Sequence, residues 1–163
     1  MGDSYTAGAA GMSTRIEHIL LENRGVASPI GGQATWRQFF TIPNILKVYN
    51  PNLFGYSFTD ASSFQRISRF NVAESGAMSR DMPYQAWNLI KRMRSNPNVN
   101  ITKHWKMVFY WIGTNDFCSD MCYLDDPSVV IEKHARELAE TLRILRDNLP
   151  RTMVNVIASP QTF

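Results

Sequence analysis

The chain has 163 residues, 44% of them hydrophobic, and a formal net charge of +3 at pH 7. This composition indicates a soluble, globular protein with a real hydrophobic core and excludes a disordered chain. The basic residues are scattered, which argues against a nucleic-acid partner, and no apolar run approaches the roughly 18 residues of a membrane span.

The first predicted element is a tight turn at Gly2-Asp3-Ser4-Tyr5-Thr6-Ala7-Gly8, and no signal peptide is expected, since the sequence opens directly on this turn. Small residues around Ser4 suit a strand-to-helix turn that exposes a serine hydroxyl, as nucleophilic catalysis requires. The same residue types dominate ordinary turns, so taken alone the triplet favours a plain turn.

Helices and strands alternate after this turn. Apolar spacing and helix-start signals predict helices over about 12–23, 43–49, 83–96 and 127–149, and strands over 69–73, 105–112 and 152–158. The longest helix has apolar positions at helical spacing at Ile131, Ala135, Leu138, Leu142, Leu145 and Leu149. The run 105–112 is nearly all apolar, typical of a central strand covered on both faces. The alternation predicts an α/β fold with a parallel sheet and helices on both faces, in a single domain over residues 1–163.

Three loops should meet at one edge of this sheet. Gly76 and Asn115 each lie in a turn after a predicted strand, Ser4 lies in the expected strand-to-helix turn, and sites in open parallel sheets form at the carboxyl ends of the strands. Ser4 would be the nucleophile, while the Gly76 N–H and the Asn115 side-chain amide would donate to an oxyanion. Either of the two later turns alone would favour an ordinary strand-ending turn; the combination favours a site.

In this order and spacing the stretches resemble the GDSL, or SGNH, family of serine esterases and lipases. The matching blocks are Gly2-Asp3-Ser4, Gly76 and Gly113-Thr114-Asn115-Asp116, and further likeness to the phospholipase B branch runs through Pro43-Asn44-Ile45-Leu46, Phe54-Gly55-Tyr56-Ser57 and Phe70-Asn71-Val72-Ala73-Glu74-Ser75-Gly76-Ala77. The resemblance implies a three-layer α/β/α flavodoxin-like fold. It also implies Ser4 as nucleophile, with an oxyanion hole made of the Ser4 and Gly76 N–H groups and the Asn115 amide.

The resemblance further implies hydrolysis of phospholipids or other acyl esters through an acyl-enzyme, with no cofactor and no metal. It leaves peripheral membrane contact open and implies an extracellular or membrane-associated parent protein. A nucleotide-binding domain is disfavoured, because both G-x-G-x-x-G and a P-loop are missing.

One family block has no counterpart here. The family ends with Asp-x-x-His, which supplies the general base, whereas His18, His104 and His134 follow Arg15, Ile101 and Ile131 at that spacing. His104 precedes its strand, and His134 is expected at a solvated helix position. We therefore expect a partial domain, incomplete at both ends and inactive alone. The alternative is a non-catalytic remnant or partner-binding module of the same fold.

Cys118 and Cys122 lie close together without a second pair, which is poor support for zinc. Two buried thiols or a local disulfide both remain open. The family resemblance and the sequon Asn100-Ile101-Thr102 point to an oxidising compartment and so favour the disulfide.

Overall fold

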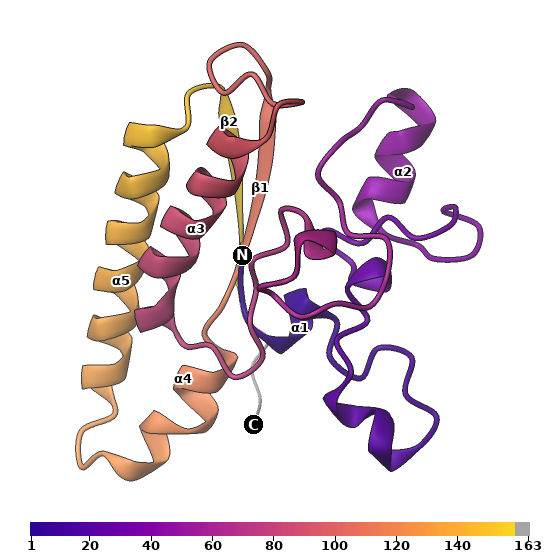
Figure 1. Cartoon of the computed structure of the whole chain (residues 1–163). Coiled ribbons are helices and arrows are strands. Elements are labelled where there is room, and N and C mark those ends of the chain that lie inside the picture. Colours follow the sequence, from indigo (N-terminus) through magenta and orange to yellow (C-terminus); the bar gives the residue numbers. More distant parts are fainter. Residues whose placement is uncertain (159–163) are drawn as a thin grey trace. The chain divides into compact units, whose positions relative to one another are not determined.

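The computed structural model describes residues 1–158, which form two compact units. The first, here called the α/β unit, contains Met1–Asp3 and the chain from Gly76 onward. The second, the loop-rich unit, contains Ser4–Ser75. Figure 1 shows the elements of each unit along the chain. The prediction of one domain over residues 1–163 stays a prediction.

A two-stranded parallel sheet forms the centre of the α/β unit. Strand β1 (Lys106–Trp111) pairs in parallel with β2 (Thr152–Ile157), from Lys106 opposite Thr152 to Trp111 opposite Ile157. The N-terminus adds to the other edge of β1: Gly2 forms a parallel bridge with Trp111, whose N–H donates to the Met1 carbonyl oxygen at 3.2 Å. Both strands predicted for this region are confirmed.

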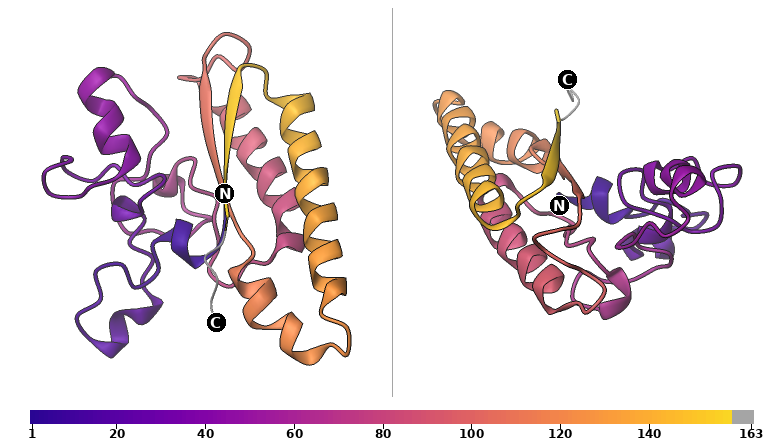
Figure 2. Two further views of the ribbon diagram at one scale, coloured as in Figure 1. Left: turned by 180° about the vertical axis from the view of Figure 1, so that it is seen from behind. Right: turned by 90° about the horizontal axis from the view of Figure 1, so that it is seen from above.

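Two long helices pack together beside the sheet. They are α3 (Met82–Ser95) and α5 (Ser128–Asn148), and both lie on the same side of the strands in Figures 1 and 2. Pro83 in the first turn of α3 fits the predicted helix start, since its missing N–H has no partner there anyway. Both predicted helices are confirmed, and the unit is α/β.

The buried face of α5 follows the apolar pattern only toward the end of the helix. Leu145 and the following Leu149 are buried as the pattern indicates, but Val130 and Thr141 are buried where Ile131 is 55% exposed and Ala135 is exposed. The N-terminal half of the helix is therefore rotated by about one position relative to the apolar pattern. Contact with neighbouring elements, not hydrophobicity alone, selects which face is covered.

Strand β1 is covered less than its apolar run suggests. Val108 and Tyr110 are buried, while Met107 on the opposite face is 42% exposed. Successive side chains of a strand point to opposite faces, so one face lies against the core and the other is partly open.

Short helices and loops make up the loop-rich unit. Its helical elements are α1 (Ser4–Ala7), η1 (Ile16–Leu20), η2 (Arg24–Val26), α2 (Ile42–Tyr49) and η3 (Arg66–Ser68). The helix predicted over 43–49 is confirmed as α2, with the Thr41 hydroxyl accepting a hydrogen bond from the Asn44 N–H at 3.3 Å.

The helix predicted over residues 12–23 is wrong. The segment holds only the five-residue 3-10 helix η1, whose apolar side chains are mostly exposed. Ala9 pairs with Glu22 in an antiparallel bridge, which ties the two ends of the intervening loop together. A continuous α-helix rises about 1.5 Å per residue and would drive these ends apart.

The strand predicted over residues 69–73 is also wrong, because a side chain takes the hydrogen bonds that a neighbouring strand would make. Arg24 is fully buried at the side of this segment. Its guanidinium donates to the carbonyl oxygens of Ala61 (2.6 Å), Asn71 (3.1 Å) and Ala73 (2.7 Å), and to the Glu22 carboxylate (2.7 Å). The Asn71 amide adds bonds to the Thr6 carbonyl oxygen and the Ala73 N–H. The backbone carbonyl oxygens of Asn71 and Ala73 are thus satisfied without a sheet.

Replacing Arg24 with methionine should lower the free energy of unfolding by about 3–5 kcal/mol, because it leaves a carboxylate and three carbonyl oxygens without their donor. Urea denaturation measures this change. Arg24→Lys should recover little, since one ammonium cannot match the planar fork of donors.

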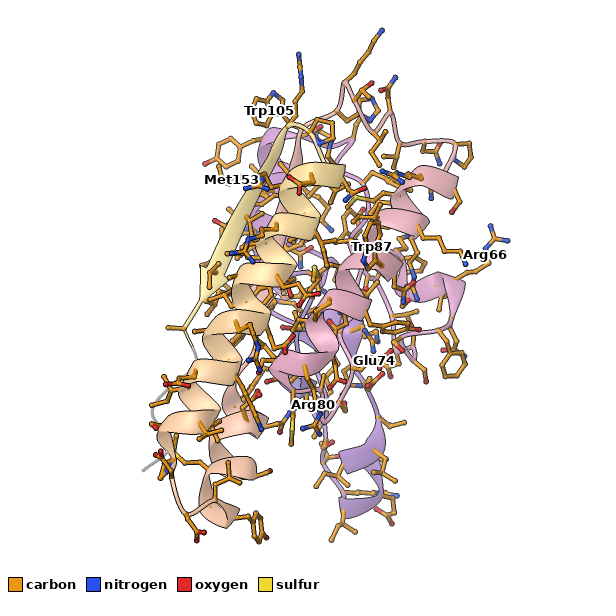
Figure 3. All side chains as sticks on the ribbon, turned by 90° about the vertical axis from the view of Figure 1, so that its left-hand side faces the viewer. Arg66, Glu74, Arg80, Trp87, Trp105 and Met153 are labelled. Atoms are coloured by element: carbon orange, nitrogen blue, oxygen red, sulfur yellow. The ribbon has the colours of Figure 1, made fainter. Side chains whose placement is uncertain are left out.

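The control is Arg66→Met, which removes an exposed cation that projects outward in Figure 3 and should change stability by less than about 0.5 kcal/mol. An Arg24→Met protein as stable as the wild type would contradict the role of Arg24.

Candidate functional site

Ser4 begins helix α1 in the loop-rich unit. The Ser4 carbonyl oxygen accepts from the Ala9 N–H at 2.9 Å, and the Asn71 amide donates to the Thr6 carbonyl oxygen at 2.9 Å. These bonds fix a four-residue helix that would be marginal by itself. Ser4 is half-buried, and no described residue of its own unit, His18 included, hydrogen-bonds to its hydroxyl. Ser4 thus lies on a fixed turn, as predicted, with no base from its unit.

The residues leading into Ser4 are held by a glutamine of α3. The Gly2 N–H donates to Gln85 Oε1 at 2.8 Å, and Gln85 Nε2 donates back to the Gly2 carbonyl oxygen at 2.9 Å. Gln85 is 1% exposed, so these bonds are shielded from water. The sequence analysis did not identify Gln85. The feature that could have indicated its role is a polar residue on the same helix face as the apolar Met82 and Leu89.

The structure brings Asn115 to the turn that contains Gly76. The Asn115 amide nitrogen donates to the carbonyl oxygen of Ala77, the residue after Gly76, at 2.8 Å. Gly76 has φ 80°, in the left-handed region that favours glycine. Its N–H has no acceptor among the described residues of the α/β unit. Two N–H donors, one from the backbone and one from the Asn115 amide, are therefore available at this turn.

An aspartate fixes the loop after β1 against the same turn. Asp116 is buried, and the Ser79 N–H donates to its two carboxylate oxygens at 3.1 and 3.0 Å. The Ser79 hydroxyl donates to Oδ1 as well. Asp116 lies in the first turn of α4 (Thr114–Cys118), and Ser79 begins η4 (Ser79–Asp81). Asp116 belongs to the Gly113-Thr114-Asn115-Asp116 block found in the sequence, but the spacing of residues in the sequence did not predict its contact with Ser79.

The two histidines of the α/β unit, His104 and His134, each contact neighbouring residues of that unit. His104 lies before the amino end of β1, and its Nδ1 accepts from the Asn100 N–H at 3.1 Å. Asn115 follows the carboxyl end of the same strand. His134 is half-buried, with its ring centroid 5.3 Å from that of Phe117, so its predicted solvated position is wrong. Packing on Phe117 covers one side of the ring.

Other groups near this turn add no base or metal ligand set. Burial raises the pKa of Tyr110, and the nearby Asp116 carboxylate adds to that rise, so the phenol stays neutral at physiological pH. Within residues 1–158 no group of three or more His, Cys, Asp or Glu side chains is placed to hold a metal ion.

Cys118 and Cys122 are exposed and are present as thiols, with the Cys122 sulfur 3.9 Å from the Cys118 carbonyl oxygen, so the expected disulfide is not formed in this structure.

Among the described residues, no helix is long and apolar enough to cross a membrane.

Comparison with known proteins gives a family and several relatives. A family model described as GDSL-like Lipase/Acylhydrolase matches residues 1–161. "Phospholipase B1, membrane-associated" from Homo sapiens is 37% identical over 96% of this chain, and the proteins of that name from Rattus norvegicus and Mus musculus are 35% and 34% identical over the same share. The chain spans about 10% of the length of these relatives. No solved structure matches the chain significantly.

Asp116→Asn should lower the free energy of unfolding by about 1–3 kcal/mol, because an amide offers one acceptor oxygen where the carboxylate offers two. Urea denaturation gives the change, and amide hydrogen exchange at Ser79 should speed up with it. Asp125→Asn, an exposed carboxylate lost from the same region, should leave both unchanged. Equal effects of the two substitutions would show that Asp116 does not fasten the turn.

Proposed function

The chain belongs to the GDSL-like lipase/acylhydrolase family, and from this premise we propose that it forms part of a serine hydrolase acting on lipid acyl esters. The observation that carries the proposal is the placement of the Asn115 amide against the Gly76–Ala77 turn. Two of the three predicted site residues thereby lie close together within one unit. We further propose that the complete fold is the three-layer, flavodoxin-like α/β/α sandwich that the family implies.

In the proposed reaction the Ser4 hydroxyl oxygen attacks the acyl carbonyl carbon. A general base takes the hydroxyl proton, and the carbonyl oxygen becomes an oxyanion. Collapse of this intermediate breaks the ester bond, releases the alcohol with a proton, and leaves an acyl-Ser4 ester. Water then attacks the acyl-enzyme in the same way and releases the fatty acid.

The oxyanion would be stabilised by N–H donors fixed before the reaction. Those proposed are the backbone N–H groups of Ser4 and Gly76 and the side-chain amide of Asn115. Fixed donors need no reorganisation as charge develops, which is why they favour the transition state. The bond from Asn115 to the Ala77 carbonyl oxygen supports this role, since it orients the amide and leaves its second N–H available.

We propose a phospholipid or lysophospholipid as substrate, and an extracellular or membrane-associated setting for the parent protein. The support is the name of the relatives, membrane-associated phospholipase B1, together with their 34–37% identity over nearly the whole chain. No metal or other cofactor is needed for this chemistry.

A second candidate function is a non-catalytic module that keeps the fold and binds a partner. The observation that favours it is the setting of the three histidines. None of them has an aspartate three residues before it, and no described residue of Ser4's own unit hydrogen-bonds to its hydroxyl. The two candidates differ in whether a supplied base restores turnover.

We expect the 163-residue chain alone to hydrolyse short acyl esters and phospholipids at rates near background. A missing triad member typically costs several orders of magnitude, because the hydroxyl needs a base. The same chain joined to a downstream Asp-x-x-His segment should hydrolyse both, as measured by fatty-acid release.

In that longer protein Ser4→Ala should abolish turnover, and Asn115→Ala should cost about 2.7–4 kcal/mol of transition-state stabilisation. Ser28→Ala, an exposed serine of the same unit, is the matched control. Turnover that survives Ser4→Ala would remove the nucleophile assignment, and a folded longer protein without turnover would favour the non-catalytic module.

A further inference from the structure

The loop-rich unit carries a cluster of aromatic rings and cations on its surface. We call it the aromatic–cation cluster, and it consists of Lys47, Phe54, Tyr56, Phe58 and Arg69. Phe54, Tyr56 and Phe58 alternate in the sequence, and all three rings lie beside the Arg69 guanidinium. Phe54 and Phe58 are each 39% exposed, so the cluster is open to solvent.

Both cations of the cluster lie over rings. The guanidinium carbon of Arg69 is 5.3 Å from the ring centroid of Phe54, 5.7 Å from that of Tyr56 and 4.8 Å from that of Phe58. The Lys47 ammonium is 4.9 Å from the Tyr56 centroid. These distances are within the range of cation–π attraction. The Lys47 ammonium also donates to the carbonyl oxygens of Gly32 and Ala34, and both cations are half-buried, so the two charges are held beside the rings at the surface.

The backbone holds Arg69 in a conformation that favours glycine, with φ 52° and ψ −118°. Its two neighbours are fastened to the aromatic segment: the Ser57 hydroxyl donates to the Ser68 carbonyl oxygen at 2.7 Å, and the Phe70 N–H donates to the Gly55 carbonyl oxygen at 3.1 Å. An arginine kept in a strained turn by bonds on both sides is a feature typical of functional positions.

The central ring is fixed as well. Tyr56 packs on Gly32, where an added Cβ would lie 2.1 Å from the ring. The Gly32 N–H donates to the Ser57 carbonyl oxygen at 2.6 Å, and Lys47 donates to the Gly32 carbonyl oxygen at 2.7 Å. The cluster is therefore preorganised by the fold, which lowers the entropic cost of binding a ligand.

Cations outnumber carboxylates in the stretch that forms the cluster. Residues 23–73 contain four basic residues that are exposed or half-buried, Arg37, Lys47, Arg66 and Arg69, and a single acidic one, Asp60, while the buried Arg24 is paired with Glu22. The Asn23 amide donates to the Asp60 carboxylate at 3.0 Å. A second pair of the same kind, Arg37 over Trp36 at 4.5 Å, lies in the same stretch. Aromatic side chains, cations and almost no carboxylates are the composition of segments that bind anionic lipid surfaces.

We propose that the aromatic–cation cluster docks the protein on a phospholipid bilayer that carries anionic headgroups. The Lys47 and Arg69 charges would face the lipid phosphates, and the exposed parts of Phe54 and Phe58 would enter the interfacial layer, where aromatic rings are favoured. This inference rests on the proposed function in that it brings the hydrolase to the surface that contains its substrate.

The test measures binding of the 163-residue chain to vesicles of phosphatidylcholine with phosphatidylserine, by co-sedimentation. The wild type should bind, and binding should weaken as salt is raised. Arg69→Gly should weaken binding about fivefold, from about 1 kcal/mol per basic residue at an anionic surface. Its melting temperature should stay close to that of the wild type, since glycine relieves the strained turn.

Phe58→Ala should weaken binding about threefold on the same vesicles, because only the exposed part of the ring is available for transfer. The matched controls are Arg66→Gln, an exposed cation with no ring beneath it, and Phe64→Ala, an 80% exposed ring. Phe64 lines a cavity of about 670 Å³ together with Glu22, Asp60 and Glu74, an acidic setting that an anionic membrane would avoid. Arg66→Gln should weaken binding less than Arg69→Gln, and Phe64→Ala should have no effect.

A wild-type chain that does not bind these vesicles would overturn the proposal, as would equal effects of the Arg66 and Arg69 substitutions. Self-association that Arg69→Gly abolishes, without vesicle binding, would instead make the cluster an interface between copies of the chain. Vesicle binding needs no turnover, whereas the proposed function is tested on soluble short-chain esters. Failure of one is therefore distinguishable from failure of the other.

Discussion

The loop-rich unit depends on the buried guanidinium of Arg24. Residues 4–75 contain one eight-residue helix and otherwise only helices of three to five residues, turns and loops, so many backbone carbonyl oxygens lack the partners that a long helix or a sheet would supply. A planar guanidinium presents five N–H donors in fixed directions and can serve several carbonyl oxygens at once. Arg24 does this for three of them, and the Glu22 carboxylate balances its charge. The Arg24 side chain thus makes hydrogen bonds to backbone carbonyl oxygens that a neighbouring strand would otherwise make.

In the α/β unit, too, polar side chains form hydrogen bonds with backbone groups of the loops. Gln85 pairs with both polar groups of Gly2, Asp116 binds the start of η4, and Asn115 binds the Ala77 carbonyl oxygen. Each of these groups is buried or partly buried, where an unmatched polar atom is costly. The loops that carry the proposed site residues are therefore positioned by side-chain bonds rather than by secondary structure.

Several aromatic side chains of the loop-rich unit are only partly covered and lie at the surface beside cations. The backbone beneath the aromatic–cation cluster is fastened by hydrogen bonds on both sides of Arg69. A positively charged, aromatic surface on the unit that also carries Ser4 fits the proposed function, in which the substrate lies in a lipid layer.

The sequence by itself determined the family, the strands β1 and β2, the helices α2, α3 and α5, and the turns that carry Ser4, Gly76 and Asn115. These features depend on local signals: apolar periodicity, helix-start residues such as Pro83, and glycine where φ is positive. Only the tertiary structure decided that residues 69–73 are not a strand and that 12–23 is not a helix. In both places hydrogen bonds from distant residues, the Arg24 guanidinium and the bridge of Ala9 to Glu22, override the local preference. It also decided which face of α5 is covered and which partners Gln85 and Asp116 find, because such bonds join residues far apart in the chain and leave no periodic trace in its sequence.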